Sequence, residues 1–237
     1  MRWIKEPKDK DVIDMTHTMY PSYMQAHVFN GAPHSKERSV VNLGSKLDTT
    51  YIVAVKGDVF VSSDDGFQVM GPEGTVVCIP GSYDIRQAVG SVAIAITRCG
   101  YRGMFGATKC EEKGRLAYID GCSDTALIQP NRLGDPCLNY LHFPVHINQT
   151  QHLHPSIRMG IVMGGGGQAW KATTEHDKGW TKDLTPGGMF CLEESEIHSF
   201  RTNESHMNII AYHPDSDTGP TDTNHPMLNR TYIDHGK

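Results

Sequence analysis

Two histidines separated by a single residue, His152 and His154, carry the clearest chemical signal in the sequence. In a β-strand, residues i and i+2 point to the same face, so this spacing predicts that the two imidazoles converge. A third histidine, His198, follows a turn-rich loop and a short apolar run over residues 189–192. Three neutral imidazoles that face one cavity suit one divalent transition metal, such as Fe, Zn, Ni or Mn. The alternative is that the three rings line a polar cavity and bind no ion permanently.

Two charged residues near these histidines are candidates for further roles, Arg158 and Glu196. A unit positive charge about 5 Å from a divalent ion, at an effective dielectric of about 20, is repelled by on the order of 6 kcal/mol. Arg158 therefore either turns away from the metal or pairs with a carboxylate such as Glu193, Glu194 or Glu196, or it holds an anionic substrate beside the metal, or it lines an anion site without metal. Glu196 precedes His198 by two residues and would share its face on a strand, as a fourth ligand or a general base. The alternative for Glu196 is a solvated acidic loop.

The segments that must position these side chains read as short β-strands separated by Gly, Pro and Asp. Residues 49–55 are rich in β-branched and aromatic residues, and residues 75–79 and 92–97 are near-continuous apolar runs. Such runs are typical of strands that are buried on both faces. Sustained helical periodicity is scarce, so the chain is predicted to be all-β.

An internal repeat indicates two similar units in one chain. The paired stretches are 74–82 with 187–195, and 51–57 with 158–164. The first copy has no His-x-His, and its position that matches His198 is Ile85. We therefore expect a metal site only in the second unit.

Residues 152–158 and 187–198 resemble the two conserved motifs of the cupin superfamily. The first motif is His-x-His followed by a glutamate, and the second leads from a glycine through a short strand to a late histidine. The resemblance implies two jelly-roll barrels (double-stranded β-helix, RmlC-like), a bicupin whose N-terminal barrel is degenerate. It places His152, His154 and His198 on the metal-ligand positions. Arg158 stands where the motif has its glutamate, but three-histidine cupins without that glutamate form a known group, so metal is still expected.

The domain organisation follows from this resemblance. We expect an N-terminal arm over residues 1–35, a degenerate barrel over 36–115 and the metal-site barrel over 116–237. The arm is predicted to pack on a barrel or on a neighbouring subunit, which favours a homodimer. The residues after the last predicted strand, including His213, are interpreted as turns without a role in the site.

Composition excludes several classes of protein. The net charge is −5 and the sequence has no basic run, whereas nucleic-acid binding usually needs a basic face. No apolar stretch is long enough to span a bilayer, and the first ten residues lack the apolar core of a signal peptide. None of the six cysteines forms a Cys-x-x-Cys pair, which fits a reducing compartment. We therefore predict a cytoplasmic protein without membrane or nucleic-acid partners.

The predicted function is that of a metal-dependent bicupin enzyme acting on a small polar or anionic organic substrate, of the dioxygenase, isomerase or lyase type. In this hypothesis, Arg158 holds a substrate carboxylate and Glu196 transfers a proton. The alternative is a non-catalytic cupin that binds a small sugar or organic acid.

Overall fold

The computed structural model describes residues 1–4, 24–30, 41–43 and 45–229. Within these ranges the chain is built from β-strands, with one helical turn, α1 (Pro226–Asn229), and a short 3-10 turn over Ile119–Gly121. The prediction of an all-β chain is confirmed. Among the described residues, no helix is long and apolar enough to cross a membrane.

The first half of the chain forms a pair of antiparallel sheets. A five-stranded sheet has the order β10-β7-β4-β9-β2, and a four-stranded sheet has the order β3-β8-β5-β6. The strands are β2 (Met24–Asn30), β3 (Val41–Leu43), β4 (Thr49–Lys56), β5 (Val59–Ser63), β6 (Gln68–Gly71), β7 (Thr75–Pro80), β8 (Tyr83–Gln87), β9 (Val92–Arg98) and β10 (Gly106–Lys109). We call these two sheets the first sheet pair.

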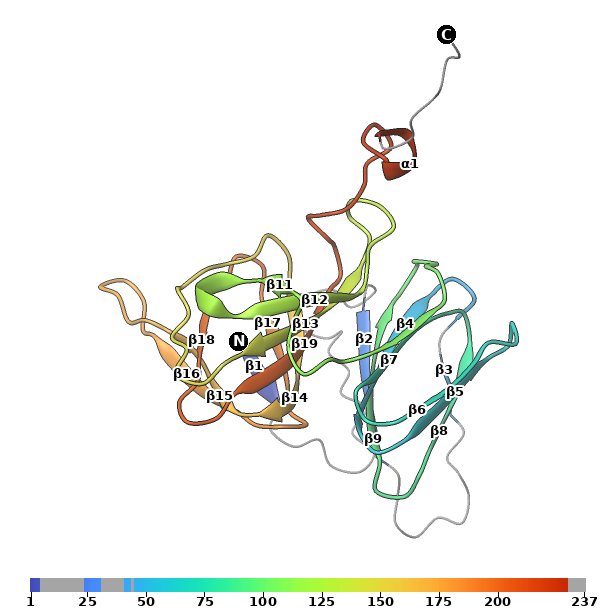
Figure 1. Cartoon of the computed structure of the whole chain (residues 1–237), viewed down its shortest axis with the longest axis horizontal. Coiled ribbons are helices and arrows are strands. Elements are labelled where there is room, and N and C mark those ends of the chain that lie inside the picture. Colours follow the sequence, from blue (N-terminus) through green and yellow to red (C-terminus); the bar gives the residue numbers. More distant parts are fainter. Residues whose placement is uncertain (5–23, 31–40, 44, 230–237) are drawn as a thin grey trace.

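The second half forms the second sheet pair, which lies beside the first (Figure 1). A seven-stranded sheet has the order β1-β17-β14-β19-β13-β12-β11, and a three-stranded sheet has the order β16-β15-β18. The strands are β1 (Arg2–Ile4), β11 (Leu116–Ala117), β12 (Ser123–Ile128), β13 (Cys137–Phe143), β14 (Arg158–Gly165), β15 (Gly167–Lys171), β16 (Trp180–Leu184), β17 (Met189–Leu192), β18 (Ser199–Arg201) and β19 (Met207–His213). Strands β2 to β10, which end at Lys109, therefore pair only with one another, and strands β11 to β19, which begin at Leu116, pair with one another and with β1. The exact domain limits stay a prediction.

The described part of the expected N-terminal arm, residues 1–4 and 24–30, contains two strands, and each joins a different sheet pair. β1 pairs with β17 through Arg2 and Cys191, so the start of the chain extends the seven-stranded sheet. β2 pairs along its whole length with β9 of the first sheet pair. The sequence did not indicate the strand at 24–30, because the signal for an edge strand is weak and its partner, β9, lies far along the chain. The remainder of the expected arm lies outside the described residues.

Three cores hold these layers together, and alternation along the strands decides which core each side chain joins. The largest core lies between the five-stranded and seven-stranded sheets and includes Tyr51, Ile161 and Tyr212, whereas Val162 and Phe190 belong to the core inside the second sheet pair. Ile161 and Val162 are neighbours on β14 and so point to opposite faces. Arg158 lies four residues before Val162 on β14, so the two side chains point to the same face. The strand pattern therefore directs this arginine into the second sheet pair.

Two glycines of β14 differ in the space around them, which allows a matched test of the packing. A Cβ at Gly160 would lie 2.0 Å from Cζ of Phe190, whereas the nearest atom to a Cβ at Gly164 would be 3.8 Å away. Gly160→Ala is therefore expected to lower the free energy of unfolding by about 1–3 kcal/mol through overpacking. Gly164→Ala is expected to change it by less than about 0.5 kcal/mol. Urea unfolding followed by tryptophan fluorescence measures both, and indistinguishable midpoints would contradict this packing.

Candidate metal centre

The His-x-His segment lies along the segment that carries His198, but the two form an interrupted ladder rather than regular strands. The N–H of His152 donates to the carbonyl of His198 and the N–H of His198 donates back, each at 2.9 Å. Ser195 N–H donates to the His154 carbonyl, also at 2.9 Å. The expectation of a continuous strand was wrong here, and Pro155, which has no N–H to donate, follows directly. The bridge nevertheless places His152 opposite His198.

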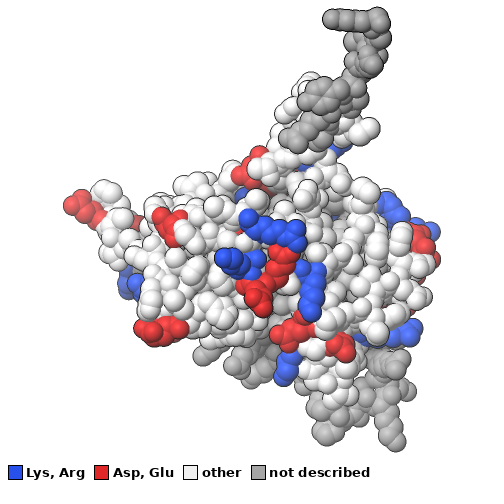
Figure 2. Space-filling view, in the orientation of Figure 1, with Lys and Arg blue, Asp and Glu red and all other residues white. Residues whose placement is uncertain are grey.

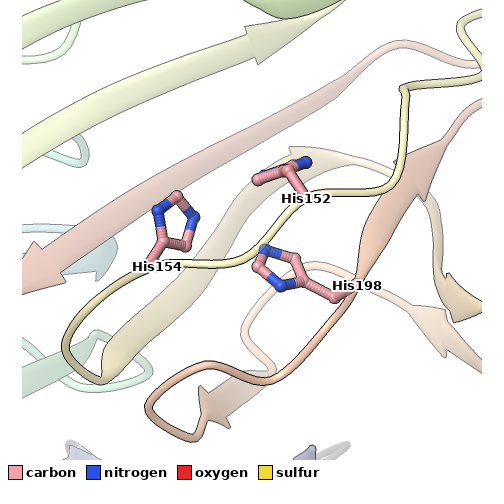
Figure 3. Close-up of side chains that lie close together, drawn as sticks. All are labelled: His152, His154 and His198. Atoms are coloured by element: carbon pink, nitrogen blue, oxygen red, sulfur yellow. The ribbon is translucent and has the colours of Figure 1, made fainter.

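The side chains of the three predicted ligands lie close together (Figure 3). One ligand atom from each of His152, His154 and His198 lies within 4.8 Å of the others. The ring centroids are 4.5 Å apart for His152 and His198, and 5.1 Å apart for each of the other two pairs. Nitrogens bound to one ion at about 2.1 Å in tetrahedral geometry are about 3.4 Å apart. Small side-chain rotations would therefore bring the three nitrogens to ligand spacing.

Two of the imidazoles have the hydrogen-bond pattern of metal ligands. Nδ1 of His198 lies 2.8 Å from the carbonyl oxygen of Glu196, and Nδ1 of His152 lies 2.9 Å from that of Thr150. A carbonyl can only accept, so the proton is assigned to Nδ1 and the lone pair is on Nε2. Nε2 of His198 is buried and has no hydrogen-bond partner. A backbone carbonyl on Nδ1 with Nε2 directed at an ion is a common arrangement at metal sites.

Burial keeps two of the imidazoles neutral. Mainly through burial, and in smaller part through the positive charge of Arg158 and the neighbouring imidazoles, the pKa of His154 is lowered to about 3 and that of His198 to about 4. Both rings are therefore unprotonated near pH 7. An ion would not have to displace a proton from either of them.

The histidines line a cavity of about 60 Å³ inside the second sheet pair. Its wall is largely apolar, with Phe143, Phe190 and Phe200 among the lining residues. Apart from the three histidines, its polar side chains are Tyr118, Asp124, Gln149, Arg158 and His213. A cavity of this size has room for an ion and only a few further atoms, because drug-sized ligands occupy about 300–1,000 Å³.

Arg158 lies on this wall, and its side chain is only 5% exposed. Its Nη1 donates to the Ser156 hydroxyl at 2.6 Å and to the carbonyls of Ser156 and Ile157 at 3.1 and 3.0 Å. Its ion pair is with Asp217, at 3.5 Å, and not with a carboxylate of the 193–196 loop, so the expected partners were wrong. The reason is that alternation along β14 points the Arg158 side chain inward, toward the C-terminal segment that contains Asp217.

Glu196, the other charged candidate, does not line the cavity. One carboxylate oxygen accepts from the N–H of Glu193 at 2.9 Å, and the other pairs with the amine of Met1. The carboxylate thus closes the turn before His198. The structure brings four of the five predicted site residues together, and Glu196 is the exception.

Sequence reasoning missed four polar residues of the cavity wall, Tyr118, Asp124, Gln149 and His213. Asp124 lies on β12, and burial raises the pKa of its carboxyl group. His213 ends β19, and its ring centroid is 6.5 Å from that of His154. The expectation that His213 has no part in the site was wrong, since it lines the cavity. Its two-residue spacing from Ala211 and Ile209, which also line the cavity, is the signal that could have found it.

In the first sheet pair, Ile85 matches His198 in the repeat. It is 1% exposed and packs in the core between the two sheets of that pair. Among the described residues, the three histidines are the one group of His, Cys, Asp or Glu side chains spaced to hold an ion. That the first unit is a degenerate cupin barrel remains a prediction.

No protein-family model matches this sequence, and no curated protein matches it. Solved structures do resemble it. Salicylate 1,2-dioxygenase from Pseudoaminobacter salicylatoxidans, determined as adducts with gentisate, aligns over 81% of this chain and 68% of its own, with 11% identity and a TM-score of 0.62. Oxalate decarboxylase from Bacillus subtilis, studied for its Mn(II) centres, aligns over 91% of this chain and 76% of its own, with 7% identity and a TM-score of 0.57.

A third similar structure is a cupin 2 conserved barrel domain protein from Leptotrichia buccalis, with 15% identity and a TM-score of 0.55. It aligns over 80% of this chain and 83% of its own. At these identities, the likeness is one of fold.

Burial of neutral histidines makes the metal-free protein sensitive to acid. The folded-state pKa values, about 3 for His154 and about 4 for His198, lie below the value of about 6.5 in the unfolded chain. The unfolded chain then binds more protons below pH 6.5, so stability is complete above about pH 6.5 and falls as the pH drops toward 4. For His198, the free energy of unfolding is expected to fall by at most about 1.4 kcal/mol per pH unit.

Urea unfolding of chelator-treated protein at several pH values measures this effect. His198→Gln is expected to flatten the dependence between about pH 6.5 and 4, because its side chain does not titrate. His176→Gln is the control, since His176 is exposed and should not change the slope. Parallel curves for wild type and His198→Gln would contradict the assignment.

Proposed function

We propose, on the premise that this chain has the cupin fold, that it is a metal-dependent enzyme acting on a small polar or anionic organic molecule. One divalent transition metal would be held by His152, His154 and His198. The observation that carries the proposal is the convergence of these three imidazoles, with two Nδ1 atoms bonded to backbone carbonyls. When bound, the ion would supply Lewis-acid or redox chemistry of the dioxygenase, isomerase or lyase type.

The protein's own residues would orient and enclose the substrate. The carbonyls of Thr150 and Glu196 fix the ring orientation of His152 and His198. The phenylalanine side chains on the cavity wall exclude water, which strengthens electrostatic interactions within the cavity.

Arg158 is proposed to bind a negatively charged group of the substrate. Its ion pair with Asp217 is long, at 3.5 Å, and Asp217 is 55% exposed, so solvent screens the pair. The charge of the guanidinium is therefore only partly neutralised within the protein. An anionic substrate would complete that neutralisation and would also offset the repulsion between Arg158 and the ion.

The second candidate function is non-catalytic binding of a small organic acid in the same cavity. The small volume of about 60 Å³ favours a compact ligand over a sugar in either case. The two functions differ in their need for metal, since a binding protein could hold an acid through Arg158 alone. The convergence of three imidazoles, of which His154 and His198 are unprotonated near pH 7, supports the metal-dependent function.

The assembly, location and other partners predicted from the sequence remain predictions. On the face drawn in Figure 2, Lys and Arg are interspersed with Asp and Glu, and neither sign forms a continuous patch. We propose a homodimer without nucleic-acid or membrane partners.

Metal content tests the proposed function. Protein purified without an affinity tag is expected to contain about one equivalent of a transition metal, measured by inductively coupled plasma mass spectrometry. His198→Gln should lose most of this metal, because it removes one of three ligands. His176→Gln, which changes an exposed histidine, should retain it. Metal-free wild-type protein that takes up neither Mn²⁺, Fe²⁺ nor Zn²⁺ in calorimetric titration would contradict the proposal.

A further inference from the structure

The cavity beside the three histidines has several buried polar atoms without a hydrogen-bond partner. They are Nε2 of His198, Oδ1 of Asp124, Oε1 of Gln149 and Nε of Arg158. Buried polar groups in proteins are almost always paired, so a cluster of unpaired groups on one cavity indicates that water or a polar ligand fills the cavity. Nε2 of His198 belongs to the proposed metal site. Of the other three, Oδ1 of Asp124 and Nε of Arg158 belong to charged groups, whose hydrogen bonds are stronger than those of the neutral Gln149 amide, so these two residues restrict most strongly what else the cavity binds.

Asp124 and Arg158 have opposite hydrogen-bonding character. Oδ2 of Asp124 accepts from Nδ2 of Asn139 at 2.9 Å, which fixes the carboxylate and leaves Oδ1 as a free acceptor. Nη1 of Arg158 is occupied by Ser156 and Ile157, whereas its Nε–H is a free donor. A ligand that satisfies both residues must therefore have an acceptor for Arg158 and a hydrogen-bond donor for Asp124.

The net charge of the site further restricts the class of ligand. A divalent ion and Arg158 bring three positive charges to this region, while Asp124 and Asp217 bring two negative charges. The nearby carboxylates of Asp215 and Glu196 add no net charge, because Asp215 pairs with Arg98 and Glu196 pairs with the amine of Met1. One unit of positive charge is left over, and a monoanion neutralises it. A zwitterion has the right donor and acceptor but leaves that charge unbalanced. With a volume of about 60 Å³, the cavity also limits the ligand to a few non-hydrogen atoms.

We propose that the substrate class of this site is the short hydroxy acids of two or three carbon atoms. The carboxylate of the hydroxy acid faces Arg158, and its hydroxyl donates to Asp124. Asp124 is thus the residue that distinguishes a hydroxy acid from the simple acid of the same length. This inference rests on the proposed function, because the charge balance includes the ion.

Binding of matched probes to Mn²⁺-loaded protein, measured by isothermal titration calorimetry, tests the inference. Glycolate has both groups, acetate lacks the hydroxyl, ethylene glycol lacks the carboxylate, and glycine replaces the hydroxyl by an ammonium group. Glycolate is expected to bind at least about tenfold more tightly than each of the other three, which corresponds to about 1.4 kcal/mol. Equal affinity for glycolate and acetate, tighter binding of glycine, or no binding of any probe would overturn the inference.

Two variants assign the selectivity to its residues. Asp124→Ala should reduce the preference for glycolate over acetate to below about threefold while Mn²⁺ still binds, because it removes only the acceptor. Arg158→Gln should weaken both acids at least about tenfold. Asp64→Ala, a change at an exposed residue of the first sheet pair, should bind all probes as wild type does. A glycolate preference that persists in Asp124→Ala would overturn the role of Asp124.

Separate controls keep the outcomes distinguishable. Far-ultraviolet circular dichroism and Mn²⁺ stoichiometry show whether each variant is folded and loaded. If Asp124→Ala does not fold, Asp124→Val, which has no polar side-chain atom and suits a strand, should also lower the preference. Failure to bind any metal would overturn the proposed function, and this inference with it. Stoichiometric metal without selectivity among the probes would overturn this inference alone.

Discussion

The backbone hydrogen bonds between the His152–His154 segment and the Ser195–His198 segment are the constraint on which the site depends. They join two stretches far apart in the chain, and each stretch is otherwise irregular at this point. Because both bonds of the His152–His198 bridge are made, the side chains of these residues must leave the backbone close together. The bonds from Nδ1 to backbone carbonyls then fix each ring. Backbone geometry therefore sets up the ligand cluster before any ion is present.

The cluster lies in an apolar interior, and this environment determines its chemistry. Burial disfavours the charged form of an imidazole, so the lone pairs stay available at neutral pH. The same burial makes an unpaired charge costly, yet Arg158 is buried on the same wall and pairs only at 3.5 Å with Asp217. A bound anion would therefore offset the positive charges of Arg158 and of a metal ion in this cavity.

The two sheet pairs contribute unequally to this arrangement. The largest core lies between them and includes Tyr51 from the first pair and Tyr212 from the second, with ring centroids 5.1 Å apart. Tyr212 directly precedes His213, and Met159 of the same core directly follows Arg158. Packing against the first sheet pair thus holds one face of β14 and β19, while the opposite face carries cavity residues. The first sheet pair supports the site but contributes none of the three predicted histidine ligands.

The sequence by itself determined the strand character of the chain and the three histidines, because strand periodicity and the short His-x-His spacing are local properties. The sequence left open whether Arg158 turns away, pairs with a carboxylate or faces the site. Only the tertiary structure decided that Arg158 lines the cavity and pairs with Asp217, that Glu196 turns away from the cavity, and that Asp124 joins the wall. These facts depend on which strands become neighbours and where the C-terminal segment passes. Such contacts join residues distant in sequence, and no local pattern encodes them.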